Sequence, residues 1–269
     1  MKTDLTPDQI AAYQKNGFLV YENFLIPAEV QELKQAVHDV VASMGKKKVV
    51  GGEGEESEGY YDKVFTQRLN LWRANPTIKS YMLNPKLGKM LCQLEGVDGF
   101  RVWHDQTLIK QPFANPTSWH LDNPYWSFCS HHSISIWIAL EDATYENGCM
   151  YYLPGSHKLA TFENAGIGQN MGDLFDIYPA FRKLDSVAAP MKAGTCGFHN
   201  GLTAHGAGPN MTRGTRMAMT CAYMPEGSTF NGQKNILPDT YFKTLTKGDV
   251  LDNDDWNPVV YSSKQLVAA

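Results

Sequence analysis

The chain has 269 residues, of which 43% are hydrophobic and 12% aromatic, and its 24 lysines and arginines against 28 aspartates and glutamates give a formal net charge of −4. This length suits one large domain, because a chain of this size buries roughly 70–75% of the surface that its unfolded form exposes. The slightly acidic balance disfavours nucleic acid and an anionic membrane as partners and favours a small molecule.

The N-terminus is polar, and no run of eighteen apolar residues occurs, so the sequence predicts neither a signal peptide nor a transmembrane helix. The five cysteines are odd in number, widely spaced and free of C-x-x-C pairs. That pattern is typical of reduced thiols rather than of a disulfide framework or a structural zinc. We therefore expect a cytoplasmic protein, and the sequence indicates no oligomeric state.

Helices are predicted in the first 98 residues. Thr6-Pro-Asp-Gln9 places a capping threonine, a proline at the first helical position and a glutamine three residues after the cap. A second helix begins at Pro27, carries apolar residues at three-to-four spacing and ends near Gly45. A third helical pattern covers residues 76–95.

A glycine-rich, charged loop is predicted from Lys46 to Gly59. Two interpretations stay open for it. It is either a solvated linker or a lid over an active site, since long loops often serve as lids.

Short segments rich in Val, Ile, Trp, Tyr and Phe begin near residue 99 and are separated by Pro, Gly and Asn clusters. Ile134, Ile136 and Ile138 alternate with Ser133, Ser135 and Trp137, which predicts a strand. Several short strands with few helices between them favour a sandwich or barrel over a parallel sheet. The predicted strands are 100–110, 133–140, 149–153, 195–199 and 215–224.

Two histidine-bearing stretches suggest a metal site. In an extended segment, side chains two residues apart share a face, so His120 and Asp122 can converge on one ion. A later stretch, from His199 to Arg216, carries His205 among small residues. A His-x-Asp pair with a distant histidine forms the two-histidine, one-carboxylate triad of non-haem Fe(II) oxygenases. Its open positions can take a bidentate 2-oxo acid and oxygen, and an arginine fork would hold the acid's far carboxylate.

Four blocks in this order resemble the phytanoyl-CoA dioxygenase family. They are Trp119–Asp122, the stretch from Trp137 to Asn147-Gly148, Pro154-Gly155-Ser156-His157, and His205-Gly-Ala-Gly-Pro-Asn210 with Arg216. The resemblance implies a mainly β, double-stranded β-helix (jelly-roll, cupin-like) fold with flanking N-terminal helices. It also implies Fe(II), 2-oxoglutarate as cosubstrate, and O2. We expect a single domain over 1–269, with a helical part at 1–98, the jelly-roll core at 99–225 and a C-terminal extension at 226–269.

The resemblance also assigns roles to individual residues. His120, Asp122 and His205 correspond to the iron ligands, and Arg216 to the 2-oxoglutarate anchor. Arg213 is the rival anchor, but its offset from His205 is less like that of the family. Gln106 and Trp137 correspond to positions that line the 2-oxoglutarate pocket.

Other side chains near these blocks have weaker assignments. Asn123, Tyr125 and Trp126 follow the iron-binding triplet and are expected to contact the substrate at the pocket mouth, although aromatic residues there also suit a core. His157 is read as part of a loop corner rather than as a ligand. His131 and His132 are adjacent, so on a strand their side chains face opposite ways and do not share an ion. His199 is expected near the pocket.

The function implied is hydroxylation of a small-molecule metabolite with release of succinate and CO2. Desaturation, demethylation or ring formation with the same cofactors stays open as the outcome. A non-catalytic jelly-roll protein that binds a metal or ligand is the alternative from another class.

Overall fold

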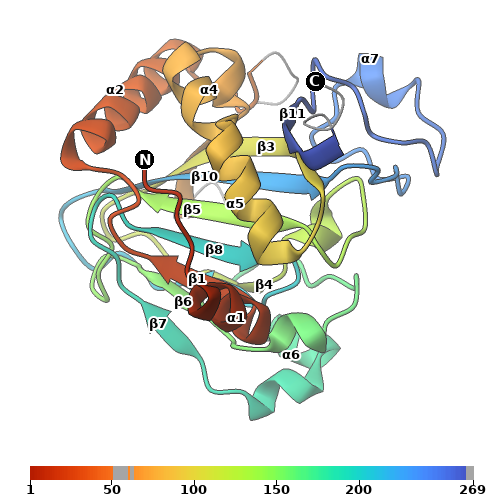
Figure 1. Ribbon diagram of the computed structural model, residues 1–269. Helices are drawn as coiled ribbons and strands as arrows, with labels where there is room; N and C mark the ends of the chain where they lie inside the picture. Colours follow the sequence, from red (N-terminus) through yellow and green to blue (C-terminus); the bar gives the residue numbers. More distant parts are fainter. Residues whose placement is uncertain (51–59, 61–63, 265–269) are drawn as a thin grey trace.

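The computed structural model describes residues 1–50, 60 and 64–264, which form two antiparallel β-sheets with helices packed around them (Figure 1). In the described chain, the larger sheet has the order β1-β8-β5-β10-β3-β11, with β2 also paired to β3, and the smaller has the order β4-β9-β6-β7. The mainly β prediction is therefore confirmed.

The strands of the larger sheet are β1 (Phe18–Tyr21), β2 (Phe65–Leu69), β3 (Gly99–Lys110), β5 (Ile134–Ala139), β8 (Cys196–Asn200), β10 (Arg216–Pro225) and β11 (Val259–Ser262). Those of the smaller sheet are β4 (Thr117–His120), β6 (Met150–Tyr152), β7 (Val187–Ala189) and β9 (His205–Ala207). All five strands predicted after residue 99 are present, with ends that differ by at most one residue. The short strands β4, β7 and β9 lack enough alternating residues to be predicted.

The first two helices begin where the sequence predicts. In α1 (Pro7–Asn16) the Thr6 hydroxyl accepts a hydrogen bond from the Gln9 N–H, and the Gln9 side chain accepts one from the Thr6 N–H. Helix α2 (Pro27–Met44) begins at its proline and is followed by Gly45. Most of the predicted 46–59 loop lies outside the described residues.

The third helical segment differs from its prediction, because residues 76–95 form two helices, α4 (Pro76–Met82) and α5 (Pro85–Glu95). Asn84 caps α5 by accepting a hydrogen bond from the Lys86 N–H. Pro85 has no N–H to continue a helix and would clash with the carbonyl one turn back. The apolar periodicity continues across this break, which explains why the pattern looked like one helix.

The helices cover the outer face of the larger sheet, and a cavity lies on its inner face. Ile134, Ile136 and Ile138 pack in the same core cluster as the buried faces of α2, α4 and α5, and Figure 1 shows these helices lying over the sheet. The alternate residues Ser135 and Trp137 line the cavity instead. The pleat of one strand therefore separates the structural core from the candidate site.

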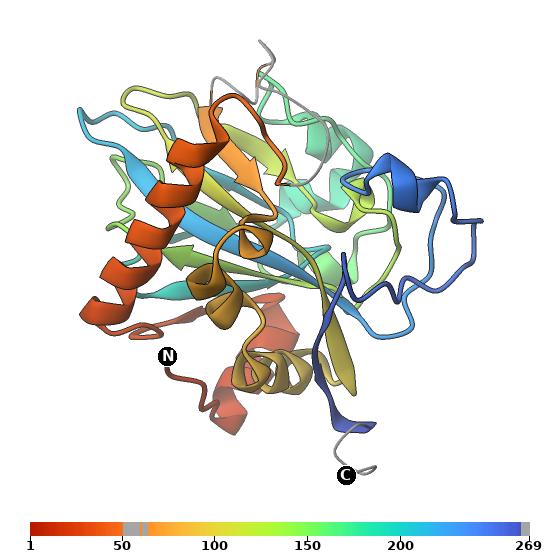
Figure 2. The ribbon, with the colours of Figure 1, turned by 90° about the horizontal axis from the view of Figure 1, so that it is seen from above.

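The C-terminal extension closes one end of the cavity. It contains α7 (Asp239–Phe242) and the edge strand β11, and it lies to one side of the sheets in Figure 2. Phe230, Leu237 and Leu251 of this segment pack with Trp103 and Trp126.

Short helices connect the strands. They are η1 (Leu71–Arg73), η2 (Asn123–Tyr125), η3 (Ser156–Lys158), α6 (Asp173–Ile177) and η4 (Pro179–Lys183). In the described part of the chain, no helix has the length and apolarity needed to cross a bilayer.

Replacing Asp105 by alanine is expected to destabilise the fold by about 3 kcal/mol. Its fully buried carboxylate accepts hydrogen bonds from the N–H groups of Leu71 and Trp72, at 2.6 and 2.8 Å, and so holds the start of η1 against β3. Each buried N–H left without an acceptor costs about 1–3 kcal/mol. Urea denaturation measures the change. Asp98→Ala is the control, because that side chain is 69% exposed and is expected to change stability by less than about 0.5 kcal/mol.

Candidate active site

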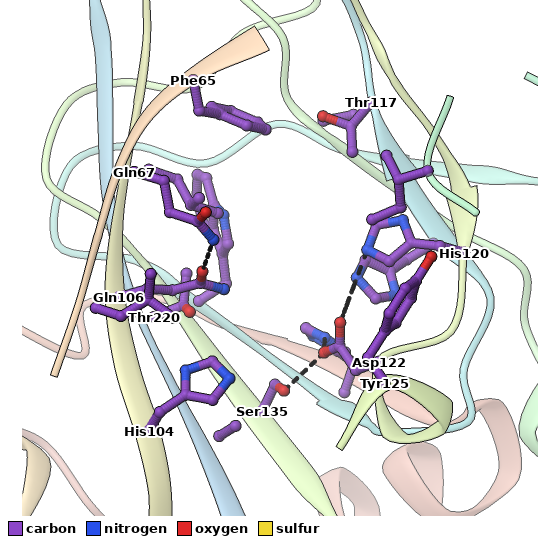
Figure 3. Close-up of a pocket in the computed structure, with 18 of the residues that line it drawn as sticks. Phe65, Gln67, His104, Gln106, Thr117, His120, Asp122, Tyr125, Ser135 and Thr220 are labelled. Atoms are coloured by element: carbon purple, nitrogen blue, oxygen red, sulfur yellow. Dashed lines mark hydrogen bonds and ion pairs between the residues drawn. The ribbon is translucent and has the colours of Figure 1, made fainter. Parts of the chain in front are cut away.

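Three predicted ligands meet on the inner face of the smaller sheet. His120 ends β4, His205 begins β9, and the two are directly paired across the strands. Their Nε2 atoms lie 3.7 and 3.6 Å from Oδ1 of Asp122, and the three ligand atoms all lie within 4.8 Å of one another. The side chains thus converge on a common centre, and Figure 3 shows His120 and Asp122 turned toward each other.

Asp122 reaches this centre by a different route from the one predicted. The strand ends at His120, and Asp122 has right-handed helical backbone angles at the start of η2. The N–H groups of Asp122 and Asn123 both donate to the carbonyl of Gly201, which turns the chain out of the strand. The expectation of one extended His-x-Asp segment was therefore wrong in its backbone, although the two side chains do converge.

The two histidines present unprotonated Nε2 atoms to the centre. Nδ1 of His120 donates to the Ser118 carbonyl at 2.8 Å, and Nδ1 of His205 donates to the Thr203 carbonyl at 2.9 Å. A carbonyl can only accept, so the ring proton is on Nδ1 in both cases. Burial lowers the pKa of both rings, which keeps them neutral.

Asp122 remains ionised in the same surroundings. Burial raises the pKa of its carboxyl, whereas the surrounding histidines, among them the His199 ring that donates a hydrogen bond to Oδ2, lower it below its ordinary value. Two neutral imidazoles and one carboxylate are the donor set that suits Fe(II) with open coordination positions. The residues present therefore fit an iron centre.

The second oxygen of Asp122 is held by two residues that sequence analysis did not assign to it. Oδ2 accepts hydrogen bonds from Oγ of Ser135 at 2.8 Å and from Nε2 of His199 at 3.0 Å. Ser135 and His199 are direct neighbours across β5 and β8. With Oδ2 occupied, Oδ1 is the oxygen turned toward the two histidines.

Removing either donor to Oδ2 is expected to weaken Fe(II) binding about 10- to 100-fold, because hydrogen-bond partners of metal ligands typically have effects of this size. Ser135→Ala and His199→Phe are the test variants, and His199→Gln keeps an N–H at nearly the same reach. Anaerobic metal titration measures the affinity. His38→Phe, at an exposed position on α2, is the control. Unchanged affinity in both test variants would contradict this role.

Arg216 lies at the other end of the cavity from the C-terminal extension. It begins β10, is fully buried, and its guanidinium lies 5.1 Å from the ring centroid of Trp137 and 5.6 Å from that of Phe65. Arg213, the rival candidate, is exposed in the loop before β10. The structure thus puts Arg216, and not Arg213, in the wall of the cavity that contains the three ligands.

Lys110 is a second buried cation beside Arg216 that the sequence analysis missed. The two residues are paired between β3 and β10, and Nζ of Lys110 donates to the Asn115 carbonyl at 2.7 Å. Burial and the Arg216 charge lower the pKa of Lys110 to about 7. One feature of the sequence could have revealed Lys110. It lies four residues after Gln106, and such an even spacing puts both side chains on one face of a strand.

The remaining predicted residues divide between the cavity and its support. Gln106, Trp137, Tyr125 and Trp126 all line the cavity, which has a volume of about 380 Å³. Asn123 is fully buried and is not among the lining residues. Its side-chain oxygen accepts a hydrogen bond from the Ser130 N–H. This position differs from the expectation of a residue at the pocket mouth.

The other histidines have separate surroundings. His157 contacts the Gln14 carbonyl at 3.3 Å, and His132 forms an ion pair with Glu95 at 3.4 Å. His199 lines the cavity, as expected. His104 also lines it, and no spacing signal in the sequence marked that residue.

Comparison with known proteins gives concordant matches. The sequence profile of the phytanoyl-CoA dioxygenase family matches residues 13–218. A phytanoyl-CoA dioxygenase of Arabidopsis thaliana is 24% identical over 250 residues, covering 80% of this chain and 87% of the relative.

Two solved structures are similar over nearly their whole length. The non-haem α-ketoglutarate-dependent carbocyclase SnoK from nogalamycin biosynthesis is 27% identical, with a TM-score of 0.79 and coverage of 95% of this chain and 96% of that one. The epimerase SnoN, in complex with Fe3+, α-ketoglutarate and nogalamycin RO, is 25% identical, with a TM-score of 0.75 and coverage of 94% and 97%.

Proposed function

This chain belongs to the phytanoyl-CoA dioxygenase family and is an iron- and 2-oxoglutarate-dependent dioxygenase, and on that premise we propose that it hydroxylates a small-molecule metabolite. One observation carries the residue assignment: a two-histidine, one-carboxylate cluster and a buried arginine line the same cavity. The balanced reaction consumes the substrate, O2 and 2-oxoglutarate and yields the hydroxylated product, succinate and CO2.

His120, Asp122 and His205 would hold the iron through two Nε2 atoms and Oδ1. When bound there, Fe(II) supplies the activation of O2 that couples decarboxylation of 2-oxoglutarate to oxidation of the substrate. Ser135 and His199 keep the carboxylate turned toward this position. These two hydrogen bonds fix the orientation of the carboxylate and so preorganise the ligand set.

Arg216 would bind the far carboxylate of 2-oxoglutarate, since its planar fork matches a carboxylate bidentately. Trp137 lies beside the guanidinium, and Lys110 adds a second positive group at the same end. Gln106 is oriented by a hydrogen bond from the Gln67 amide and lines the intervening wall. These residues would point the keto-acid end toward the triad.

Tyr125 and Trp126 are proposed substrate contacts, because both line the cavity and directly follow the triad loop. The Tyr125 hydroxyl donates to the Ala165 carbonyl at 2.7 Å, which holds the 161–172 segment beside the cavity. Asn123 would act through this loop rather than by touching the substrate. A cytoplasmic location stays part of the proposal and is supported by the five free thiols.

Ring formation or epimerisation is the alternative outcome, favoured by the likeness to a carbocyclase and an epimerase. Mass spectrometry of the product distinguishes the outcomes. Hydroxylation adds one oxygen atom derived from O2, desaturation or ring closure removes two hydrogen atoms and adds none, and epimerisation leaves the mass unchanged and gives a stereoisomer that chiral chromatography separates. A succinate-release screen across metabolite classes identifies the substrate first. Oxygen incorporation from labelled O2 supports hydroxylation, and its absence overturns it in favour of the alternative.

A further inference from the structure

The half of the cavity far from Arg216 has its own set of residues. Arg216 and Ala222 lie on the same face of β10, six residues and so about 20 Å apart along the strand. Ala222 is paired with His104 of β3, so His104 also lies at the end opposite Arg216. Trp126 and, from the C-terminal extension, Asn235 and Ile236 complete the lining of this end. We call this half, lined by His104, Trp126, Ala222, Asn235 and Ile236, the distal chamber.

The cavity carries little fixed charge. Among its described lining residues, Asp122 is the only carboxylate and Arg216 the only lysine or arginine. In the proposed function, Asp122 binds the metal and Arg216 binds 2-oxoglutarate. His104 adds no charge at neutral pH, because burial lowers the pKa of its ring to about 4. The distal chamber is therefore polar but uncharged.

His104 turns one edge of its ring to the cavity. The residue is only 7% exposed and lines the cavity wall. Nδ1 is buried inside the wall, so Nε2 is the ring nitrogen that a bound molecule can reach. Figure 3 shows the ring on the opposite side of the cavity from Tyr125 and Asp122. A neutral imidazole nitrogen at a cavity wall can donate a hydrogen bond to, or accept one from, a polar group of a bound ligand.

The rest of the chamber is aromatic and aliphatic. The Trp126 ring stacks on Phe128 with centroids 5.5 Å apart and meets the His104 ring edge-on at 6.3 Å. Ile236 and Ala222 add apolar surface. These rigid rings suit a ring-bearing body, and a charged group placed here would be buried without a counter-charge.

We infer that the substrate is an uncharged molecule with a ring-bearing apolar body, and that His104 hydrogen-bonds a hydroxyl or carbonyl group on it. This inference rests on the proposed function, because it assigns the Arg216 end to 2-oxoglutarate. It narrows the substrate class to neutral compounds and makes His104 a specificity-determining residue.

Equilibrium dialysis of the anaerobic enzyme loaded with Fe(II) and 2-oxoglutarate tests it with three matched probes: 2-naphthol, naphthalene and 2-naphthoate. We expect 2-naphthol to bind at least about tenfold more tightly than the anion, since the anion lacks a counter-charge. His104→Leu is expected to weaken 2-naphthol binding about fivefold, the value of one hydrogen bond, and to leave naphthalene binding unchanged. His104→Gln restores the 2-naphthol affinity, and His38→Leu on α2 changes neither.

The inference is overturned if 2-naphthoate binds as tightly as 2-naphthol, or if neither neutral probe binds saturably. It is also overturned if His104→Leu weakens naphthalene as much as 2-naphthol. The visible charge-transfer band of the metal complex is recorded before any probe is added. Its absence would count against the proposed function, whereas a normal band with the wrong probe preference counts against the neutral substrate alone.

Discussion

Oxygen-dependent succinate formation falls below detection in Asp122→Ala. The substitution removes the carboxylate that faces the two histidines, and it leaves Ser135 and His199 without the acceptor that they share. Two neutral imidazoles alone hold Fe(II) weakly, because the charged ligand and its preorganisation are both lost. Succinate formation under air and Fe(II) binding without oxygen are the two measurements.

Asp176→Ala is the matched control for this variant. Asp176 is an exposed aspartate in α6 whose side chain pairs with Arg182 at the surface. It is expected to keep full activity and metal affinity. Circular dichroism of both variants verifies folding. Asp122→Ala enzyme that folds and still forms succinate at a comparable rate would contradict the assignment of the ligand.

Arg216→Ala is expected to raise the KM for 2-oxoglutarate about a hundredfold, with a smaller effect on kcat. Truncating one partner of a buried charged pair costs about 2–5 kcal/mol, and each 1.4 kcal/mol is tenfold in affinity. Here Lys110 remains beside the site and offsets part of the loss. Initial rates against 2-oxoglutarate concentration give the two constants.

Arg213→Ala separates this role from the rival assignment. Arg213 lies three residues earlier, in an exposed loop, and its removal is expected to leave KM unchanged. The double variant Lys110→Met with Arg216→Ala should bind 2-oxoglutarate more weakly than either single variant. A larger effect of Arg213 than of Arg216 would reverse the assignment of the anchor.

Local sequence patterns predicted the parts of this protein that depend on near neighbours. The capped start of α1, the proline start of α2 and the alternation in β5 are properties of a few consecutive residues. The triad was predictable because His120 and Asp122 form a short motif and His205 lies in a distinctive small-residue stretch. The sequence predicts the break between α4 and α5 only if Pro85 is given more weight than the apolar spacing that continues across it.

The residues that were missed depend on pairing between distant strands. Ser135 meets His199, and Lys110 meets Arg216, only because of the register of β5 with β8 and of β3 with β10. The alternation within one strand shows which residues share a face, but not which residues of a distant strand lie opposite them. His104 and the C-terminal Asn235 likewise become neighbours of the cavity only when β10 and the extension are folded around it. Most of the support for the site is therefore nonlocal.

Anaerobic titration of the protein with Fe(II) and 2-oxoglutarate measures whether the three ligands and Arg216 form one cofactor site. We expect a visible charge-transfer band that saturates at one 2-oxoglutarate per bound iron, is lost in Asp122→Ala and is weakened in Arg216→Ala. Admission of oxygen should then discharge the band with formation of succinate. The absence of a band, together with tightly bound zinc that iron cannot replace, would contradict the dioxygenase account and favour a non-catalytic metal-binding protein.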